Sequence, residues 1–250
     1  MTMSTQQQNK KVAFITGGNR GIGLDTAKAL GAKGYALVLG VRDLDKATDA
    51  LNVLRGADFQ AEAVVYDAAD KGTDAAVAAY FEKTWGRLDV LVNNAGVLLE
   101  GLGGNSTVDG SDDDLEATFA VNFFAVTRLT RALLPLVKKA EAGRIVNVSS
   151  ILGSLTLHAD PKSPIAGSKA FAYNASKAAL NAFTIHLADA LKDTPIKVNA
   201  IHPGWVQTPL GGAGAPEPVD GSGRASAKLA TVGADGPHGG FFTADGPLPW

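Results

Sequence analysis

Short apolar runs recur along the chain and alternate with longer stretches of helical pattern. The runs barely alternate between apolar and polar positions, which is typical of strands that are covered on both faces. They are Val12–Thr16, Ala36–Val41, Ala63–Tyr66, Val90–Val92, Ile145–Val148, Val198–Ile201 and Gly240–Thr243. The helical stretches between them cover residues 22–33, 43–55, 71–85, 112–140 and 171–192.

This alternation predicts an α/β fold in which right-handed crossovers connect parallel strands. The rhythm continues without a break, so we expect one doubly wound Rossmann domain over residues 11–250. Its sheet should have seven strands, be mainly parallel and be flanked by helices. The polar residues 1–10 are expected to form a flexible tail.

Two segments interrupt the rhythm. Residues 99–111 are polar and rich in glycine, and residues 209–223 are rich in Gly, Pro and Ala. Composition alone would make the second segment a disordered linker. Long loops inside compact domains are often functional, however, and this one follows the sixth strand. We therefore expect a substrate lid over residues 209–226.

Composition excludes several classes of function. The chain of 250 residues is 46% hydrophobic with a net charge of −2, which argues against a nucleic-acid partner. It has no cysteine, and no two of its four histidines have helical i, i+4 spacing, so we expect no metal site. There is no run of 18 apolar residues and no apolar leader, so we expect no membrane segment and a cytoplasmic location.

A glycine cluster follows the first predicted strand and begins the first predicted helix. Residues 16–23 read TGGNRGIG, with glycines at 17, 21 and 23. Glycines here allow a tight turn and a close approach of the backbone to a pyrophosphate, which the helix N-terminus would bind. A strand-to-helix turn often needs glycine for its own sake. The position in the first strand–helix unit nevertheless favours a dinucleotide site.

Two arginines suggest which dinucleotide binds. An NAD site usually carries an acid at the end of the second strand, whereas here the strand is followed by Arg42, and Arg20 lies in the glycine loop. Guanidinium groups suit a ribose 2′-phosphate, so we expect NADP(H). The alternatives are that both arginines are ordinary surface residues, or that the neighbouring Asp43 serves NAD.

Six motifs in order resemble those of the short-chain dehydrogenases/reductases, over about residues 11–246. They are TGGNRGIG at 16–23, NNAG at 93–96, Asn122, Ser150, the YxxxK motif Tyr173–Lys177, and Pro203-Gly204 with Thr208. Carbonyl-reductase-like members are the most similar, on the basis of HPGWVQT at 202–208, the C-terminal pattern and Arg42. Ser150 and Tyr173 stand further apart than is usual in the family, so residues 157–171 look like a short insertion that leaves the substrate pocket and subunit contacts open.

The resemblance implies a set of site residues. Asp67 and Ala68 would contact adenine, Lys177 would bond the nicotinamide ribose, and the PG segment would also face the cofactor. The complete expected cofactor set is Gly17, Asn19, Arg20, Gly21, Ile22, Gly23, Arg42, Asp67, Ala68, Asn94, Ala95, Gly96, Tyr173, Lys177, Pro203, Gly204, Val206 and Thr208.

The chemistry of four residues fits carbonyl reduction. Tyr173 and Lys177 share a helix face, and the lysine ammonium should lower the phenol pKa, which is normally near 10. Tyr173 would then act as general acid/base and Ser150 would polarise the substrate carbonyl. The resemblance implies that Asn122 holds a water that connects to Lys177. Each residue alone could have a purely structural role.

The sequence therefore predicts an NADPH-dependent enzyme that reduces a ketone or an aldehyde to an alcohol, reversibly. One alternative is a 3-oxoacyl thioester reductase, although no basic cluster for its carrier is evident. Another is a non-catalytic NADPH-binding signalling protein, which need not keep the catalytic residues. The partner is a small-molecule carbonyl or alcohol, and apolar helices favour a homo-oligomer, either dimer or tetramer.

Overall fold

The computed structural model describes residues 10–101 and 106–250, and in it seven parallel strands form one sheet. The spatial order is β3-β2-β1-β4-β5-β6-β7. This confirms the predicted Rossmann-like α/β fold. The predicted tail lies, apart from residue 10, outside the described residues. The strands are β1 Val12–Thr16, β2 Ala36–Val41, β3 Ala61–Val65, β4 Val90–Asn93, β5 Arg144–Val148, β6 Lys197–Ile201 and β7 Phe241–Phe242.

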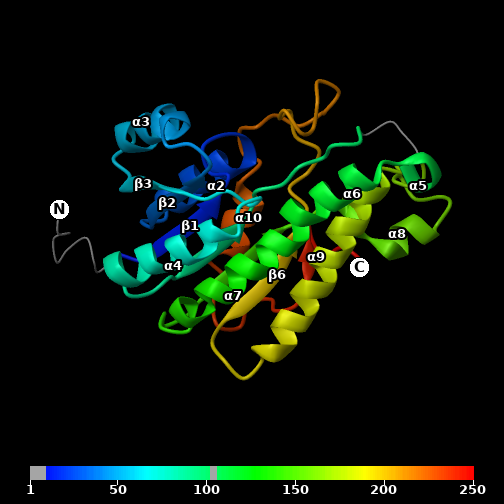
Figure 1. Cartoon of the computed structure of the whole chain (residues 1–250). Helices are drawn as coiled ribbons and strands as arrows, with labels where there is room; N and C mark the ends of the chain where they lie inside the picture. The colour runs from blue at the N-terminus through cyan, green and yellow to red at the C-terminus, as the bar shows by residue number, and fades with distance from the viewer. Residues whose placement is uncertain (1–9, 102–105) are drawn as a thin grey trace.

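Helices cover both faces of the sheet (Figure 1). Alternate residues of β1 supply both cores: Val12 and Phe14 pack on one side, and Ala13 and Ile15 on the other. The first core includes residues of α4 (Gly72–Thr84), α7 (Val126–Val137) and α9 (Phe171–Ala190). The second includes residues of α2 (Gly21–Gly31), α3 (Thr48–Gly56) and α10 (Arg224–Leu229). Burial on both faces explains why the strand sequences barely alternate.

The direction of the sheet order reverses between β1 and β4, which pair in register from Ala13 opposite Val90. Ligands of open α/β sheets bind at such a switch point, beyond the carboxyl ends of the strands. The loops that follow β1, β2, β3 and β4 therefore meet at one edge of the sheet.

The long predicted helix at 112–140 is one run of three elements. These are α6 (Asp112–Phe119), a π-helical segment η2 (Ala120–Ala125) and α7. By length and composition this run, Asp112–Val137, is apolar enough to cross a membrane, with a mean hydropathy of 1.3 in its most apolar window. Half of that window is buried in the fold, and Leu129, Leu133 and Leu136 belong to the core. We interpret it as a core helix.

Short helices were the main elements missed by the sequence patterns. They are α5 (Ser106–Asp109), η3 (Ile151–Gly153), α8 (Leu155–Ala159) and α10, whereas η1 (Asp45–Ala47) lies within the predicted helical stretch 43–55. The lid over residues 209–226 stays a prediction, and its last residues, from Arg224, belong to α10. The start of α10 is anchored to α2, where the Gly223 N–H donates to Asp25 Oδ2 at 2.8 Å.

Candidate active site

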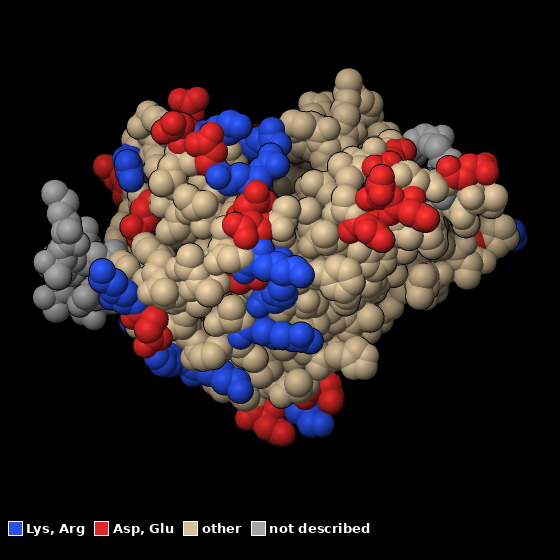
Figure 2. All heavy atoms as spheres, viewed as in Figure 1, with Lys and Arg blue, Asp and Glu red and all other residues tan. Residues whose placement is uncertain are grey.

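A cavity of about 290 Å3 opens at the switch point of the sheet. Figure 2 shows basic side chains beside a recess on this face, and acidic ones over α5 and α6. Of the expected cofactor residues, Pro203, Gly204, Val206, Tyr173 and Lys177 do not line the cavity. Those that do are Gly17, Asn19, Arg20, Gly21, Ile22, Gly23, Arg42, Asp67, Ala68, Asn94, Ala95, Gly96 and Thr208.

The glycine loop has the geometry of a cradle. Gly21, the first residue of α2, has a φ of +54°, a conformation that side-chain-bearing residues rarely adopt. A side chain at position 23 would collide with the Gly17 carbonyl and with Asn94. The backbone therefore turns sharply and leaves the N–H groups of the first α2 turn directed at the cavity, where an anion fits.

Thr16 and Asn94 connect the loops that follow β1 and β4. The Thr16 hydroxyl oxygen accepts hydrogen bonds from the Asn94 and Ala95 N–H groups, both at 2.9 Å. The Asn94 amide donates to the Thr16 carbonyl at 2.8 Å. Asn94 thus lies in the cavity wall and also holds the two loops together. The preceding Asn93 braces strands instead, because it donates to Asn147 at 2.8 Å and to Thr130 at 3.1 Å.

Several residues of the cavity wall were not predicted. Tyr66 is the best example, because its position as the last apolar residue of a strand gave no sign that it reaches a ligand cavity. The others lie next to predicted residues or at strand ends, and a rule that includes every residue at the carboxyl edge would have found most of them. The set is Gly40, Val41, Tyr66, Ala69, Val97, Val121, Pro209 and Leu210.

Three of the four expected catalytic residues meet where β5 ends against α9. Ser150, Tyr173 and Lys177 are 7%, 7% and 4% exposed, and the Lys177 ammonium lies 5.6 Å from the centre of the Tyr173 ring. A hydrogen bond joins the Ser150 and Tyr173 side chains. The approach of η3 to α9 is close, because a Cβ at Gly153 would lie 2.8 Å from the Lys177 backbone. This packing fixes Ser150 beside the helix that carries Tyr173 and Lys177.

Asn122 lies in the π-helical segment η2, and such segments are frequent at functional sites. Its side-chain oxygen accepts from the Val97 N–H at 2.8 Å, and its amide donates to the Val97 carbonyl and to Ser176. A Cβ at Gly96 would lie 3.3 Å from Asn122 Oδ1 and 3.6 Å from Lys177 Nζ. Because Gly96 has no side chain, no Cβ lies beside Asn122 Oδ1 and Lys177 Nζ at this edge of the cavity.

The expected lowering of the tyrosine pKa by Lys177 is wrong for this structure. Burial raises the pKa of Tyr173 to about 12, although the hydrogen bond with Ser150 acts in the opposite direction. Burial also lowers the pKa of Lys177 to about 8. Removal from water is the largest cause of both shifts, because it disfavours phenolate and ammonium alike. Tyr173 is therefore held as a neutral phenol.

The segment after β6 forms a closed loop beside the cavity. The Gln207 N–H donates to the Glu217 carbonyl at 2.8 Å, and the Glu217 N–H donates to the Trp205 carbonyl at 3.1 Å. Trp205 is 48% exposed, so it is not a core residue, and its indole N–H donates to Gly211. Thr208 at the start of the loop lines the cavity, whereas Val206 is buried at the loop base.

The family model for short chain dehydrogenases matches residues 11–217. The protein belongs to the short-chain dehydrogenase family. It is accordingly an oxidoreductase that uses a nicotinamide cofactor. Among its relatives is a ketoacyl reductase, so named, of the monensin polyketide synthase of Streptomyces virginiae, 36% identical over 206 residues that cover 82% of this chain and 74% of the relative.

Solved structures of carbonyl reductases resemble this short-chain dehydrogenase over nearly its whole length. The carbonyl reductase Sniffer of Drosophila melanogaster superposes with a TM-score of 0.83 and 30% identity, covering 96% of this chain and 99% of the other. An NADPH-bound carbonyl reductase from chicken fatty liver gives 0.82 and 28% identity, with the same coverage. These similarities support the resemblance to carbonyl reductases found in the sequence.

Proposed function

We propose that this short-chain dehydrogenase is an NADPH-dependent reductase of ketones or aldehydes. The observation that supports this most directly is the buried group of Tyr173, Ser150 and Lys177, next to a cavity whose glycine cradle fits a dinucleotide. The reduced nicotinamide supplies a hydride to the carbonyl carbon. The protein residues bind, orient and protonate the substrate.

Tyr173 donates the proton. Its raised pKa keeps the phenol neutral at physiological pH, so it has a proton to give to the carbonyl oxygen as negative charge develops there. Ser150 orients that oxygen by hydrogen bonding and stabilises the developing charge. The phenolate then regains a proton from solvent, through Lys177 and a water held by Asn122.

NADPH rather than NADH fits the residues that follow β1 and β2. Arg20 and Arg42 line the cavity, where forked guanidinium donors suit a 2′-phosphate. Asp43, the acidic alternative for NADH, is occupied elsewhere: its carboxylate accepts from the Asp45 N–H at 3.0 Å and lies 4.0 Å from Lys46 Nζ. These contacts support the arginines as the groups that recognise the cofactor.

A 3-oxoacyl thioester reductase is the second candidate, because one relative is named as a ketoacyl reductase. The electrostatics oppose it. The first turn of α6 carries Asp112, Asp113 and Asp114. Acidic side chains gather over α6 in Figure 2, and α6 packs against α9, the helix of Tyr173 and Lys177. An acyl carrier bears phosphate and would be repelled there. We therefore propose a free small carbonyl compound as substrate.

The test is a cofactor titration followed by a carbonyl panel. We expect tight NADPH binding by fluorescence, and loss of NADPH absorbance with free aldehydes or ketones but little with a 3-oxoacyl thioester. The Tyr173→Phe variant should bind NADPH normally and lose about 100- to 10,000-fold in rate, the usual contribution of proton transfer. Tyr35→Phe is the control. No turnover across the panel would favour a non-catalytic NADPH-binding protein.

We also propose that the protein acts in the cytoplasm as a single catalytic domain over residues 11–250 that assembles into a homo-oligomer. Phe124 on η2 and Ile185 on α9 are 51% and 41% exposed on outer helices, where a partner subunit would cover them. Light scattering on the purified protein gives the subunit number, and a strictly monomeric mass would contradict the assembly.

A further inference from the structure

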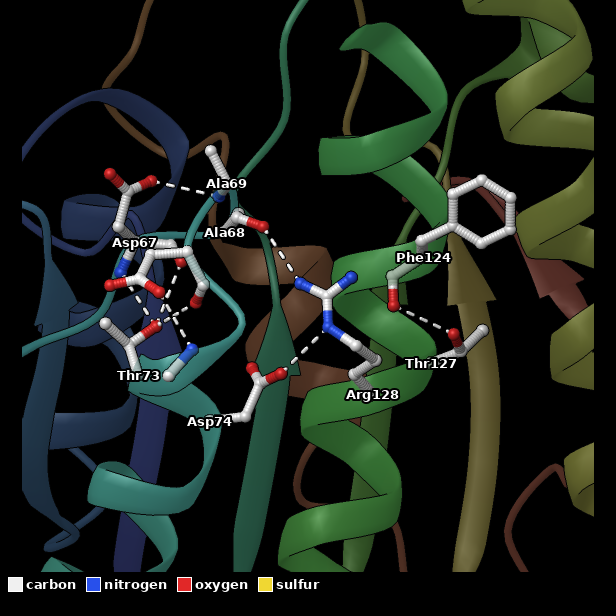
Figure 3. Close-up of polar contacts among 10 residues, drawn as sticks. Asp67, Ala68, Ala69, Thr73, Asp74, Phe124, Thr127 and Arg128 are labelled. Carbon is white, nitrogen blue, oxygen red and sulfur yellow. Dashed lines mark hydrogen bonds and ion pairs between the residues drawn. The ribbon is translucent and has the colours of Figure 1, made fainter. Parts of the chain in front are cut away.

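Arg128 on α7 connects three segments of the fold beneath one wall of the cavity (Figure 3). Its guanidinium Nε donates to Asp74 Oδ2 on α4 at 3.0 Å. Its Nη2 donates to the Ala68 carbonyl at 3.2 Å, in the loop that follows β3. Ala68 is itself part of the cavity wall. One side chain therefore fastens a loop of the cavity to two helices.

Burial makes these contacts more important than those of a surface ion pair. Asp74 is 6% exposed, and burial raises the pKa of its carboxyl while Arg128 acts against that rise. Burial, with a further contribution from Asp74, also raises the pKa of Tyr66, and Arg128 opposes this too. Tyr66 lines the cavity. Arg128 thus supplies the positive charge that balances a buried acid behind the cavity wall.

The loop after β3 has a second set of contacts that fixes its shape and joins it to the start of α4. The Thr73 hydroxyl donates to the Asp67 carbonyl at 3.0 Å and to the Asp70 carbonyl at 2.8 Å. The Asp67 carboxylate accepts from the Ala69 N–H at 3.0 Å (Figure 3). All these residues lie within seven consecutive positions that end in the first turn of α4. The Arg128 contact differs because it sets where the whole turn lies relative to α7.

The same helical run also reaches the other end of the cavity. Val121 and Asn122 belong to η2, the element that directly precedes α7. Val121 lines the cavity, and the Asn122 side chain accepts a hydrogen bond from Val97 in the loop after β4. One rigid element therefore contacts both the turn expected at adenine and the loop beside the catalytic group. A change at Arg128 should loosen the first contact and leave the second in place.

We infer that Arg128 is a positioning residue for the adenine half of the cofactor. It holds the Ala68 carbonyl and the Asp67–Ala69 turn at the distance from the glycine loop that adenine binding requires. This inference rests on the proposed function, in which the cavity holds NADPH. Arg128 lies outside the cavity wall and controls affinity for the adenine half of the cofactor only.

Cofactor fragments test this half-specific effect. Calorimetry or ligand-observed NMR would measure binding of adenosine 2′,5′-bisphosphate and of reduced nicotinamide mononucleotide to the wild type and to Arg128→Met. We expect about tenfold weaker binding of the adenine fragment and less than a twofold change for the nicotinamide fragment. With NADPH and a carbonyl substrate, KM for NADPH should rise while kcat stays within twofold.

The exposed Arg131, one turn further along α7, provides the matched control Arg131→Met, which should change neither fragment's affinity. Because Arg128→Met leaves the Asp74 carboxylate buried without its partner, the double variant Arg128→Met with Asp74→Asn is measured as well. This pair removes the buried charge, so it should fold and still show the tenfold loss.

Unchanged binding of the adenine fragment by both variants would overturn the inference, and so would an equal loss for both fragments. Wild-type protein that binds neither NADPH nor the adenine fragment would overturn the proposed function itself, which distinguishes the two failures. A tenfold loss confined to the adenine fragment in both variants, with Arg131→Met like wild type, supports the inference.

Discussion

The Glu100 carboxylate accepts a hydrogen bond from the backbone N–H of Tyr173, with Oε1 2.7 Å from the nitrogen. Helix α9 begins two residues earlier, at Phe171, and its N-cap Ala170 has no side chain that can cap it. Glu100, from the loop after β4, therefore supplies the acceptor that a capping side chain usually provides. Its negative charge at the N-terminus of α9 also interacts favourably with the helix dipole. The loop and the expected proton donor are tied together directly.

Removing this contact should slow catalysis without weakening NADPH binding. We expect Glu100→Ala to lower kcat about tenfold, equivalent to about 1.4 kcal/mol, because the first turn of α9 that carries Tyr173 loses its cap. Glu100→Gln keeps an acceptor oxygen and should retain most of the activity. Steady-state kinetics with fluorescence titration of NADPH measures both effects. The exposed Glu116→Ala is the control, and a Glu100→Ala enzyme with wild-type kcat would show that the contact is incidental.

Arg42 should determine the preference for NADPH over NADH. A charged hydrogen bond contributes about 1.5–3 kcal/mol, so losing it in Arg42→Asp should weaken NADPH binding about 30-fold. NADH has no 2′-phosphate and should bind equally well or better. Fluorescence titration of each nucleotide gives the two dissociation constants. Lys46→Ala, beside Asp43 but outside the cavity wall, is the control, and equal losses for both nucleotides would place recognition of the phosphate elsewhere.

Much of the fold and of the candidate site could be predicted because the signals for them are local in the sequence. β1 and β2 were predicted with their observed bounds, since continuous apolar runs mark strands that are covered on both faces. The glycine loop and the Tyr173–Lys177 spacing likewise act over a few residues. Arg128 and Glu100 could not be identified, because their partners are 60 and 73 positions away and nothing in the surrounding sequence marks them. The raised pKa of Tyr173 was missed for the same reason, since burial depends on the tertiary structure.

Gly23 should be essential for cofactor binding because of space rather than backbone conformation. The Cβ of Gly23→Ala would meet the Gly17 carbonyl and the Asn94 amide, so the glycine loop must shift. Overpacking of this kind costs about 1–3 kcal/mol, so we expect NADPH and NADH both to bind about 5- to 150-fold more weakly. At Gly56, near the end of α3, a Cβ meets nothing within 4 Å, so Gly56→Ala is a matched control. Unchanged affinity in Gly23→Ala would mean that the loop has more freedom than its packing indicates.

Lys177 should reduce the stability of the protein while serving its function. Burial lowers its pKa from the usual 10.5 to about 8, so below pH 8 the folded state carries the full cost of a buried ammonium, about 3 kcal/mol. Lys177→Met removes this cost but leaves the Val148 carbonyl without its donor at 2.8 Å, a loss of about 1 kcal/mol. We expect the variant to be inactive. In urea unfolding at pH 7 without cofactor, it should be more stable than the wild type by about 2 kcal/mol.

The pH dependence of that difference identifies its cause. Between pH 8 and 10.5 the unfolded state binds more protons at Lys177 than the folded state does, so the wild type gains stability from this group as the pH rises. The stability advantage of Lys177→Met should therefore shrink steadily over this window. Above it the variant should be less stable than the wild type by about 1 kcal/mol, because only the loss of the Val148 contact remains. The exposed Lys33→Met should show no such trend. If the stability advantage stays constant with pH, the ammonium is not destabilised by burial, and the extra stability comes from the packing of the methionine side chain.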